Sequence, residues 1–460
     1  MPPEHLRFGG GAADSTIVPA MALFLLIACI LILVLSRQKA IAPFLIAGLV
    51  IPVNQVVVLG GLHFSPIRIL VLVAMVRMIV SPGHERFAGG INRIDQMVAL
   101  WSVFAVVAFF LEFPGTPAVI QGAGDLIDTL GGYLAVRYLI PDGASLRNTI
   151  KALALVCVIQ GVPMIVERIA QINVFGYFAG IPVVSTIRDG KVRAAGTMGA
   201  LSAGPFAGMC VPLFLWLWSK RESRTIAICG LISAMAMVIT SNSSTSLSTL
   251  LGAFIALSFW RFRKQMRPFR WGVATALLSL HLLMKAPVWA LIARLDFTGS
   301  SSSYQRYALI DMTIRHFSDW WLIGTNEYLN WGWDSWDTCD QFVDVALKGG
   351  LIPLIFFIAT LSRSFGMIGR ARKLVEGNRK EEWFLWCFGA AVFASFVSCW
   401  GINFTGILLL AFFALLALLP VAKAEALRTV RETVGSRNQE RLAFAGGAKQ
   451  VKSWAQAWSR

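Results

Sequence analysis

Basic side chains gather in two segments of the chain that are bordered by long apolar runs. They are Arg188, Lys191 and Arg193 in segment 168–196, and Arg294, Arg306 and Arg315 in segment 287–344. The planar guanidinium group of arginine can hold two oxygens of one anion at once. The pattern therefore predicts a binding site for an anion with several oxygens, such as a phosphate. The alternative is that each arginine pairs with one of the carboxylates that are frequent in 287–344.

Three titratable residues of segment 287–344 could transfer a proton during a reaction. Asp337 and Asp340 stand just before the next apolar run, where a carboxylate could deprotonate a hydroxyl group or could simply cap a helix. His316 is the only histidine of the segment, and its imidazole could act as a general base or pack beside tryptophans. Both interpretations stay open for each of the three residues.

Tryptophans are frequent in the same segment. Trp331, Trp333 and Trp336 lie in its middle among polar residues, next to Gln341. Tryptophan is common at membrane interfaces, which is one explanation. Flat aromatic faces in a polar loop also suit the apolar faces of sugar rings. We therefore take Trp333, Trp336 and Gln341 as candidates for contact with a substrate.

A run of small hydroxyl residues, 242–246 (NSSTS), joins two apolar runs with almost no linker. Small residues allow close helix packing in membranes, and these hydroxyls could also line a groove for a polar headgroup. Neither a glycine-rich phosphate loop of the Walker type nor a His-Glu-x-x-His or Cys-x-x-Cys metal motif occurs in the sequence. We therefore expect chemistry without a metal or cofactor.

The composition indicates that these residues are held in a membrane. Only 14% of the residues are charged and 56% are hydrophobic, whereas soluble domains carry about 25% charged residues. Apolar runs of about 20 residues, the length that a helix needs to cross the hydrocarbon layer, recur along the chain. We expect an all-α fold, a polytopic bundle of about 12–14 transmembrane helices with a large folded loop between late helices.

Thirteen apolar runs are candidate spans: 16–36, 41–61, 66–81, 95–113, 118–138, 148–167, 197–218, 225–241, 244–260, 271–288, 343–362, 384–401 and 404–422. The fifth is the weakest, because Gln121, Asp125, Asp128 and Arg137 interrupt it. It could cross as a polar-faced helix buried in the bundle, or it could lie at the membrane surface.

Most other basic residues lie in short connectors between the spans, as Arg37, Lys220, Arg263 and Arg370 do. Lys and Arg in short loops mark the cytoplasmic side of a membrane protein. The net charge of +16 is therefore a sign of orientation and not of nucleic-acid binding. This orientation places the N-terminus and both segments with the unusual arginines on the outer side. The expected parts are N-terminal helices (1–167), central helices (168–286) that begin with exported loop 168–196, the large exported loop (287–344), C-terminal helices (345–422) and a basic cytoplasmic tail (423–460) beside membrane lipid.

Four stretches of the chain, taken in order, resemble the superfamily of bacterial O-antigen ligases and O-antigen polymerases. They are 193–199 (RAAGTMG), 240–248 (TSNSSTSLS), 304–310 (YQRYALI) with 321–324 (WLIG), and 340–351 (DQFVDVALKGGL). These stretches cover roughly 190–360, and the first third of the chain adds only a compatible hydropathy. The resemblance implies an inner-membrane glycosyltransferase whose active side is periplasmic.

The resemblance also implies a donor, a site and partners. The donor is a glycan linked to polyprenyl pyrophosphate, and Arg193 and Arg306 match the family's arginines for the pyrophosphate. A glycan acceptor displaces the pyrophosphate without a metal, and other proteins of polysaccharide assembly and export are expected partners. Ligases of the family carry a histidine just before the next span, where this chain has 336–341 (WDTCDQ). This departure favours a polymerase, or a transferase that uses another acceptor. Asp337 or Asp340 is then the hypothetical base.

A multi-pass transporter or a flippase of lipid-linked glycan is the main alternative. A transport path should place ionisable residues near the middle of the membrane. The predicted spans are mostly free of them, apart from a few: Arg77, Asp125, Asp128, His281 and Lys285. An envelope scaffold without catalysis is a third possibility. The polar residues gather in the exported segments, and this distribution favours an enzyme.

Overall fold

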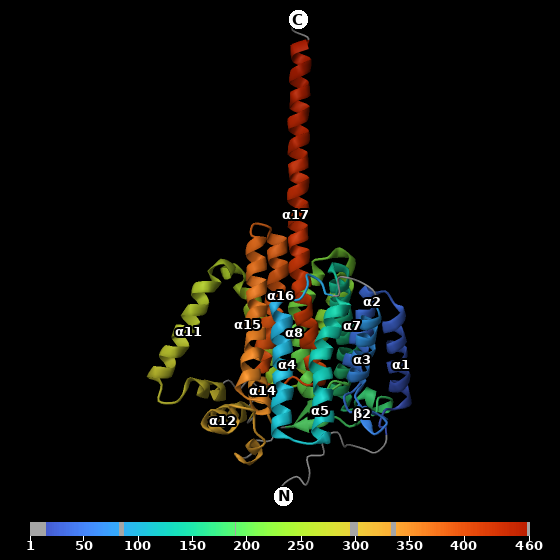
Figure 1. Ribbon diagram of the computed structural model, residues 1–460, viewed down its shortest axis with the longest axis vertical. Coiled ribbons are helices and arrows are strands. Elements are labelled where there is room, and N and C mark those ends of the chain that lie inside the picture. Colours follow the sequence, from blue (N-terminus) through green and yellow to red (C-terminus); the bar gives the residue numbers. More distant parts are fainter. Residues whose placement is uncertain (1–14, 82–86, 189, 295–301, 333–336, 458–460) are drawn as a thin grey trace.

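The computed structural model describes residues 15–81, 87–188, 190–294, 302–332 and 337–457, and they form a bundle of helices with two short β-hairpins (Figure 1). Within these residues, eight helical segments are long and apolar enough to cross a membrane: Arg93–Glu112, Gly143–Ala170, Ala200–Trp218, Arg221–Thr240, Ser244–Leu283, Leu351–Leu374, Arg379–Cys399 and Gly406–Glu432. The expected all-α fold is confirmed, and the chain is a multi-pass membrane protein.

The first three predicted spans correspond to shorter helices, α1 (Pro19–Val34), α2 (Arg37–Val50) and α3 (Pro66–Val80). The second prediction, 41–61, was too long. The chain leaves the helix at Val50 and forms an antiparallel hairpin of β1 (Val57–Leu59) and β2 (Leu62–Phe64). Gly60 and Gly61 make its turn with φ values of 59° and 79°, the left-handed conformation that a two-residue hairpin turn requires. The glycine pair therefore marks the turn of the hairpin and not the end of α2.

The polar fifth segment is a continuous helical stretch with a π-helical turn in its middle. It consists of α5 (Thr116–Leu126), η1 (Ile127–Gly131) and α6 (Gly132–Leu139). Asp128 accepts two hydrogen bonds from Arg68, at 3.0 and 2.7 Å. Arg137 is fully buried and lies 3.3 Å from Asp95. Ion pairs to α3 and to α4 (Arg93–Glu112) thus compensate the charges of Asp128 and Arg137, and Asp125 accepts a hydrogen bond from Gln121 Nε2 at 2.9 Å.

Local caps define where several long helices begin. Asn92 and Asp95 form a reciprocal capping box at the start of α4, and Asp142 and Ser145 do the same for α7 (Gly143–Ala170). Each box satisfies N–H groups that have no partner inside the helix. The central elements follow: η2 (Val174–Tyr177), β3 (Thr186–Arg188), β4 (Lys191–Arg193), α8 (Ala200–Trp218), η3 (Arg221–Ser223), α9 (Arg224–Thr240), α10 (Ser244–Ser258), η4 (Phe259–Gln265) and α11 (Met266–Leu283).

The large loop is folded, as predicted. Its elements are η5 (Val288–Arg294), α12 (Ser302–Arg315), α13 (Phe317–Trp320), η6 (Glu327–Asn330) and α14 (Gln341–Gly349). Leu309, Ile310 and Trp320 pack with residues of α14 in a small core of their own. Thr325 N–H donates to Leu347 O at 2.8 Å, and Leu351 N–H donates to Trp321 O at 2.9 Å. These backbone bonds fix the loop to the junction between α14 and α15.

Three helices complete the bundle: α15 (Leu351–Leu374), α16 (Arg379–Cys399) and α17 (Gly406–Ala457). Helices α8 and α17 are the most deeply buried of the eight candidate spans and form its centre. Helix α11 stands apart at the side of the bundle, and none of its residues is buried (Figure 1).

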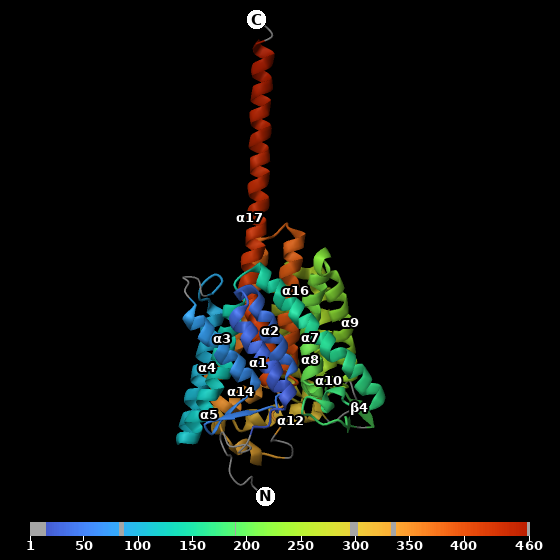
Figure 2. The ribbon, with the colours of Figure 1, turned by 90° about the vertical axis from the view of Figure 1, so that its right-hand side faces the viewer.

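The bundle has two chemically different ends. Helices α12 and α14 and both hairpins lie at one end, and α17 projects from the other in both views (Figures 1 and 2). We call the first the cap end. The second, the basic end, holds the short connector 219–223, which contains Lys220 and Arg221, and the connector 375–378, which is flanked by Lys373 and Arg379. Both segments with the unusual arginines therefore meet at the cap end, which is where a shared site could form.

Candidate functional site

The connector between α9 and α10 is built from small hydroxyl residues at the cap end. Ser241 Oγ donates to Val238 O at 3.0 Å and lies 2.9 Å from Ser246 Oγ. Ser246 faces Gly204 of α8, where an added Cβ would lie only 2.0 Å from Ser246 Oγ. Asn242 takes a left-handed φ of 46°, which asparagine tolerates better than most residues. The run predicted to allow close packing does bring the starts of α8 and α10 together.

Arg306 reaches from α12 to this hydroxyl turn. Its Nη2 donates to Thr245 Oγ1 at 2.8 Å, to Ser244 Oγ at 3.3 Å and to Gly401 O at 3.4 Å. Thr245 Oγ1 in turn donates to Gly401 O at 2.9 Å. The folded loop, α10 and the end of α16 are thus joined at one guanidinium group.

Arg193 ends strand β4 on the other side of the same turn. The next residue, Ala194, donates its N–H to Thr240 O at 3.1 Å. The 193–199 stretch and the 304–310 stretch are therefore tied to the two sides of the 240–248 stretch. Three of the segments singled out in the sequence meet in space, although more than 100 residues separate Arg193 from Arg306.

A buried carboxylate on α7 holds the loop after Arg193. Glu167 Oε1 accepts from Ala195 N–H at 3.1 Å, and Oε2 accepts from Gly196 N–H at 3.0 Å. Ser185 Oγ adds a third hydrogen bond at 3.1 Å. Glu167 is 1% exposed, and these donors replace the water that its carboxylate group loses on burial. The carboxylate fixes the backbone that carries Arg193.

Gln160, about two turns before Glu167 on the same face of α7, holds the same loop through both the oxygen and the nitrogen of its side-chain amide. Its Oε1 accepts from Thr197 N–H at 3.0 Å, and its Nε2 donates to Thr197 Oγ1 at 2.5 Å. Gly196 has a left-handed φ of 53°, and a Cβ there would come within 2.4 Å of Gln160 Oε1. Gly196 is therefore required both by the backbone conformation and by the close approach of Gln160.

Two helix N-termini add to the positive character of this region. Helix α8 begins after Gly199 and helix α10 after Ser243, and in the described structure neither N-cap makes a side-chain hydrogen bond. The N-terminus of a helix carries partial positive charge and unpaired N–H groups. Together with Arg193 and Arg306, the starts of α8 and α10 make this part of the cap end suited to an anion.

Asp340 provides a carboxyl group with an altered proton affinity near Arg306. Its Oδ1 caps α14 by accepting from Phe342 N–H at 2.7 Å and Val343 N–H at 3.1 Å. Its Oδ2 is buried and has no hydrogen-bond partner among the described residues. Burial raises the pKa of Asp340 to about 7, although those N–H groups and the charge of Arg306 lower it. Such a carboxyl group can gain or lose a proton near neutral pH.

The connector 400–405 is fixed by neighbours of Asp340. Gln341 Oε1 accepts a hydrogen bond from Phe404 N–H. Asp344 lies 2.8 Å from Lys348 Nζ, accepts from Thr338 Oγ1 at 2.7 Å and lies 3.5 Å from Asn403 Nδ2. Gln341, a predicted substrate ligand, thus has a structural partner within the chain.

The other candidates lie apart from this arrangement or outside the described residues. Arg188 and Lys191 face each other across the exposed hairpin of β3 and β4. Arg315 is largely exposed and pairs with Asp311 at 2.7 Å, the ion-pair alternative. His316 stacks on Trp331 with ring centroids 4.5 Å apart and lies 3.0 Å from Asp319.

Asp337 is half-buried three residues before Asp340, and its carbonyl accepts from Cys339 N–H at 2.9 Å. Trp333 and Trp336 lie outside the described residues. Sequence reasoning missed Glu167, Gln160 and Lys348. Glu167 did give a signal, because an acid near the end of an apolar helix is unusual and needs a partner.

Among the described residues, no group of three or more His, Cys, Asp or Glu side chains could hold a metal ion. Comparison of the chain with known protein families, curated proteins and solved structures gives no match. The support for a function therefore comes from the arrangement at the cap end: two arginine-bearing segments on one hydroxyl turn, two helix N-termini and a buried carboxyl group.

Proposed function

We propose that the protein is a membrane glycosyltransferase of cell-envelope polysaccharide synthesis, of the O-antigen polymerase and ligase type. Its donor would be a glycan linked to polyprenyl pyrophosphate, and its cap end would face the periplasm of the bacterial inner membrane. The acceptor would be a second glycan, and proteins of polysaccharide assembly and export would be its partners. The observation that carries this proposal is the position of Arg306 on the hydroxyl turn to which the Arg193 segment is also tied.

The proposed donor suits the chemistry of this position. Cleavage of a sugar–pyrophosphate bond leaves negative charge on the pyrophosphate oxygens. Cations and helix N-termini that are fixed before the reaction stabilise such charge without reorganisation. Arg306 is held by Ser244 and Thr245, and the loop after Arg193 is held by Glu167. The Arg306 guanidinium group and the backbone that follows Arg193 are therefore held in place before an anion binds at the membrane surface.

The proposed base is Asp340. A hydroxyl oxygen of the acceptor would form the new bond to the anomeric carbon of the donor sugar. The bond from that carbon to the pyrophosphate would break, and its electron pair would leave with the pyrophosphate. The hydroxyl proton would pass to the Asp340 carboxylate, whose pKa of about 7 makes it a base at neutral pH. An aspartate here, in place of the ligase histidine, favours polymerisation over transfer to lipid A core.

Turnover by the purified protein in nanodiscs tests this proposal. The substrate is a polyprenyl-pyrophosphate glycan from the protein's own host, and the products are lengthened glycans and free polyprenyl pyrophosphate. We expect Arg306→Ala to lower turnover at least 100-fold, and Arg306→Lys to restore only part of it. Arg315→Ala is the matched control, because Arg315 lies on the same helix but is exposed and paired with Asp311.

The outcomes separate the proposed enzyme from its alternatives. A ladder of longer lipid-linked glycans supports a polymerase, and transfer to a different acceptor supports a ligase. Movement of glycan across sealed vesicles without turnover would instead identify a flippase. In the described structure Asp128 is paired with Arg68, and the buried Arg137 is paired with Asp95, which gives less support to a transport path. Equal turnover by Arg306→Ala and wild type would refute the assignment of the pyrophosphate site.

A further inference from the structure

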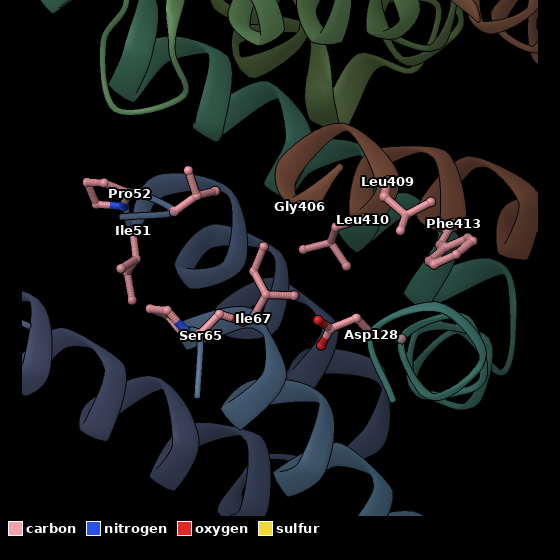
Figure 3. Close-up of a pocket in the computed structure, with 12 residues that line it drawn as sticks. Ile51, Pro52, Ser65, Ile67, Asp128, Gly406, Leu409, Leu410 and Phe413 are labelled. Atoms are coloured by element: carbon pink, nitrogen blue, oxygen red, sulfur yellow. The ribbon is translucent and has the colours of Figure 1, made fainter. Parts of the chain in front are cut away.

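A cavity lies at the cap end, away from Arg306. It has a volume of about 200 Å³ and lies between the end of α2, the start of α3, the π-helical turn η1 and the start of α17 (Figure 3). Ile51, Ile67, Leu410 and Phe413 supply most of its apolar surface. Asp128 is its one charged lining residue among those described. The cavity is thus an apolar space with a single carboxylate in its wall.

The hydrogen bonds of Asp128 determine which polar group could enter. Arg68 Nε donates to Asp128 Oδ1 at 3.0 Å and Arg68 Nη2 donates to Oδ2 at 2.7 Å. Nη1 of Arg68 is directed to His63 O at 3.2 Å. Each carboxylate oxygen can accept a further hydrogen bond, and the Asp128 side chain is 30% exposed. The wall therefore offers hydrogen-bond acceptors, which favour a hydroxyl or ammonium group over a carboxylate.

The backbone keeps this space open. Gly132 and Gly406 lack side chains where the cavity borders α6 and α17. A Cβ added to Gly132 would meet Phe413 at 3.7 Å and Val71 at 3.8 Å, which is ordinary van der Waals contact. Asp128 itself lies in the π-helical turn, and such turns occur often at functional sites in helices. The backbone at Gly132 therefore accommodates a Cβ, and we expect a longer side chain there to occupy the cavity.

From the size and lining of the cavity we infer that it is a binding site for a short hydrocarbon segment with a hydrogen-bond-donating head group. A volume of about 200 Å³ is roughly that of seven water molecules at about 30 Å³ each, and hexan-1-ol, with its seven non-hydrogen atoms, is a ligand of this size. The hydrocarbon contacts Leu410 and Phe413, and the hydroxyl or ammonium group donates to Asp128. This ligand site is independent of the proposed glycosyl transfer.

Photolabelling tests this inference on the full chain in nanodiscs. The probe is an aliphatic alcohol with a diazirine in its chain, and labelled residues are identified by mass spectrometry. We expect labelling at 406–413 and 51–53, reduced at least fivefold by hexan-1-ol or hexylammonium. Hexanoate and heptane, at the same concentration in the membrane, should compete poorly. Gly132→Leu should reduce labelling at least fivefold, whereas Gly272→Leu, at an open position on α11, should not.

Two further experiments complete the test. One identifies the source of the ligand, and the other provides a second variant in case the first does not fold. Lipids extracted from purified wild type and Gly132→Leu show whether a membrane lipid supplies the head group or a free alcohol does. Leu410→Trp is a second way to fill the cavity if Gly132→Leu does not accumulate. Equal labelling in a folded, filled variant would overturn the inference, and so would equal competition by hexanoate and hexan-1-ol. Loss of glycan turnover alone would bear only on the proposed function.

Discussion

Burial gives the two oxygens of Asp340 different surroundings: one caps α14 and the other is enclosed. Its pKa rises from 3.8 to about 7 because the charged form is desolvated. Between these values the folded protein holds a proton that the unfolded chain has lost, so stability falls as pH rises. Relative to Asp340→Asn, which keeps the cap, the wild type should lose a few kcal/mol from pH 4 to 8. Thermal unfolding in detergent across this range measures the difference.

A suitable control is an exposed aspartate with the opposite pKa shift. Hydrogen bonds from Ser318 and His316 hold the pKa of Asp319 below its usual value. Any stability it contributes is present at neutral pH and is lost as pH falls. Asp319→Asn should therefore leave the wild-type trend between pH 5 and 8 unchanged. Parallel unfolding profiles for wild type and Asp340→Asn would contradict the raised pKa of Asp340.

Glu167 is expected to act on Arg193 through the backbone that it holds. Glu167→Gln keeps the shape but replaces one acceptor by an NH₂ group, so either Ala195 or Gly196 loses its hydrogen bond. Leaving a buried N–H unpaired costs about 1–3 kcal/mol. Hydrogen exchange at Ala195 and Gly196 should accelerate at least tenfold, and the proposed turnover should fall. Glu222→Gln, at an exposed position of the basic end, should change neither.

Helices α8 and α10 contact each other through Gly204 and Ser246. This contact helps to position the hydroxyl turn that Arg306 binds. A Cβ at Gly204 would lie 2.0 Å from Ser246 Oγ and 2.5 Å from Ser241 Oγ. Gly204→Ala must therefore push the two helices apart or expel the serines. We expect a loss of about 1–3 kcal/mol in stability, measured against Gly272→Ala on α11. A melting temperature equal to that of the control would show that the contact is not tight.

The sequence predicts elements better than it predicts their partners. Runs of about 20 apolar residues identify the spans because lipid imposes one length on a crossing helix. The same hydropathy did not show where α2 ends, since the apolar residues of the β1–β2 hairpin continue the run. Arg193 and Arg306 could be singled out because charge is rare in this chain. Glu167 and Gln160 could not be assigned, since their role depends on a loop that returns to α7 after more than 25 residues.

At the scale of the whole molecule, the separation of charge between the two ends should determine its orientation. The connectors of the basic end, 219–223 among them, carry Lys and Arg, and α17 projects from that end (Figure 2). The positive-inside rule therefore predicts that this end is cytoplasmic. The rule counts Lys and Arg in short loops close to the spans. The arginines of the cap end, such as Arg306, lie in longer segments, so we do not count them when we assign the orientation.

Reporter fusions in bacterial cells test this orientation directly. A fluorescent protein that folds only in the cytoplasm should be bright when attached after residue 457. Alkaline phosphatase, which is active only outside the cytoplasm, should be active when inserted in the turn of the exposed β3–β4 hairpin and inactive within 219–223. The reverse pattern would place the Arg306 site in the cytoplasm. A pyrophosphate-linked donor presented at the periplasmic face could not then reach it, and the proposed reaction would have to be abandoned.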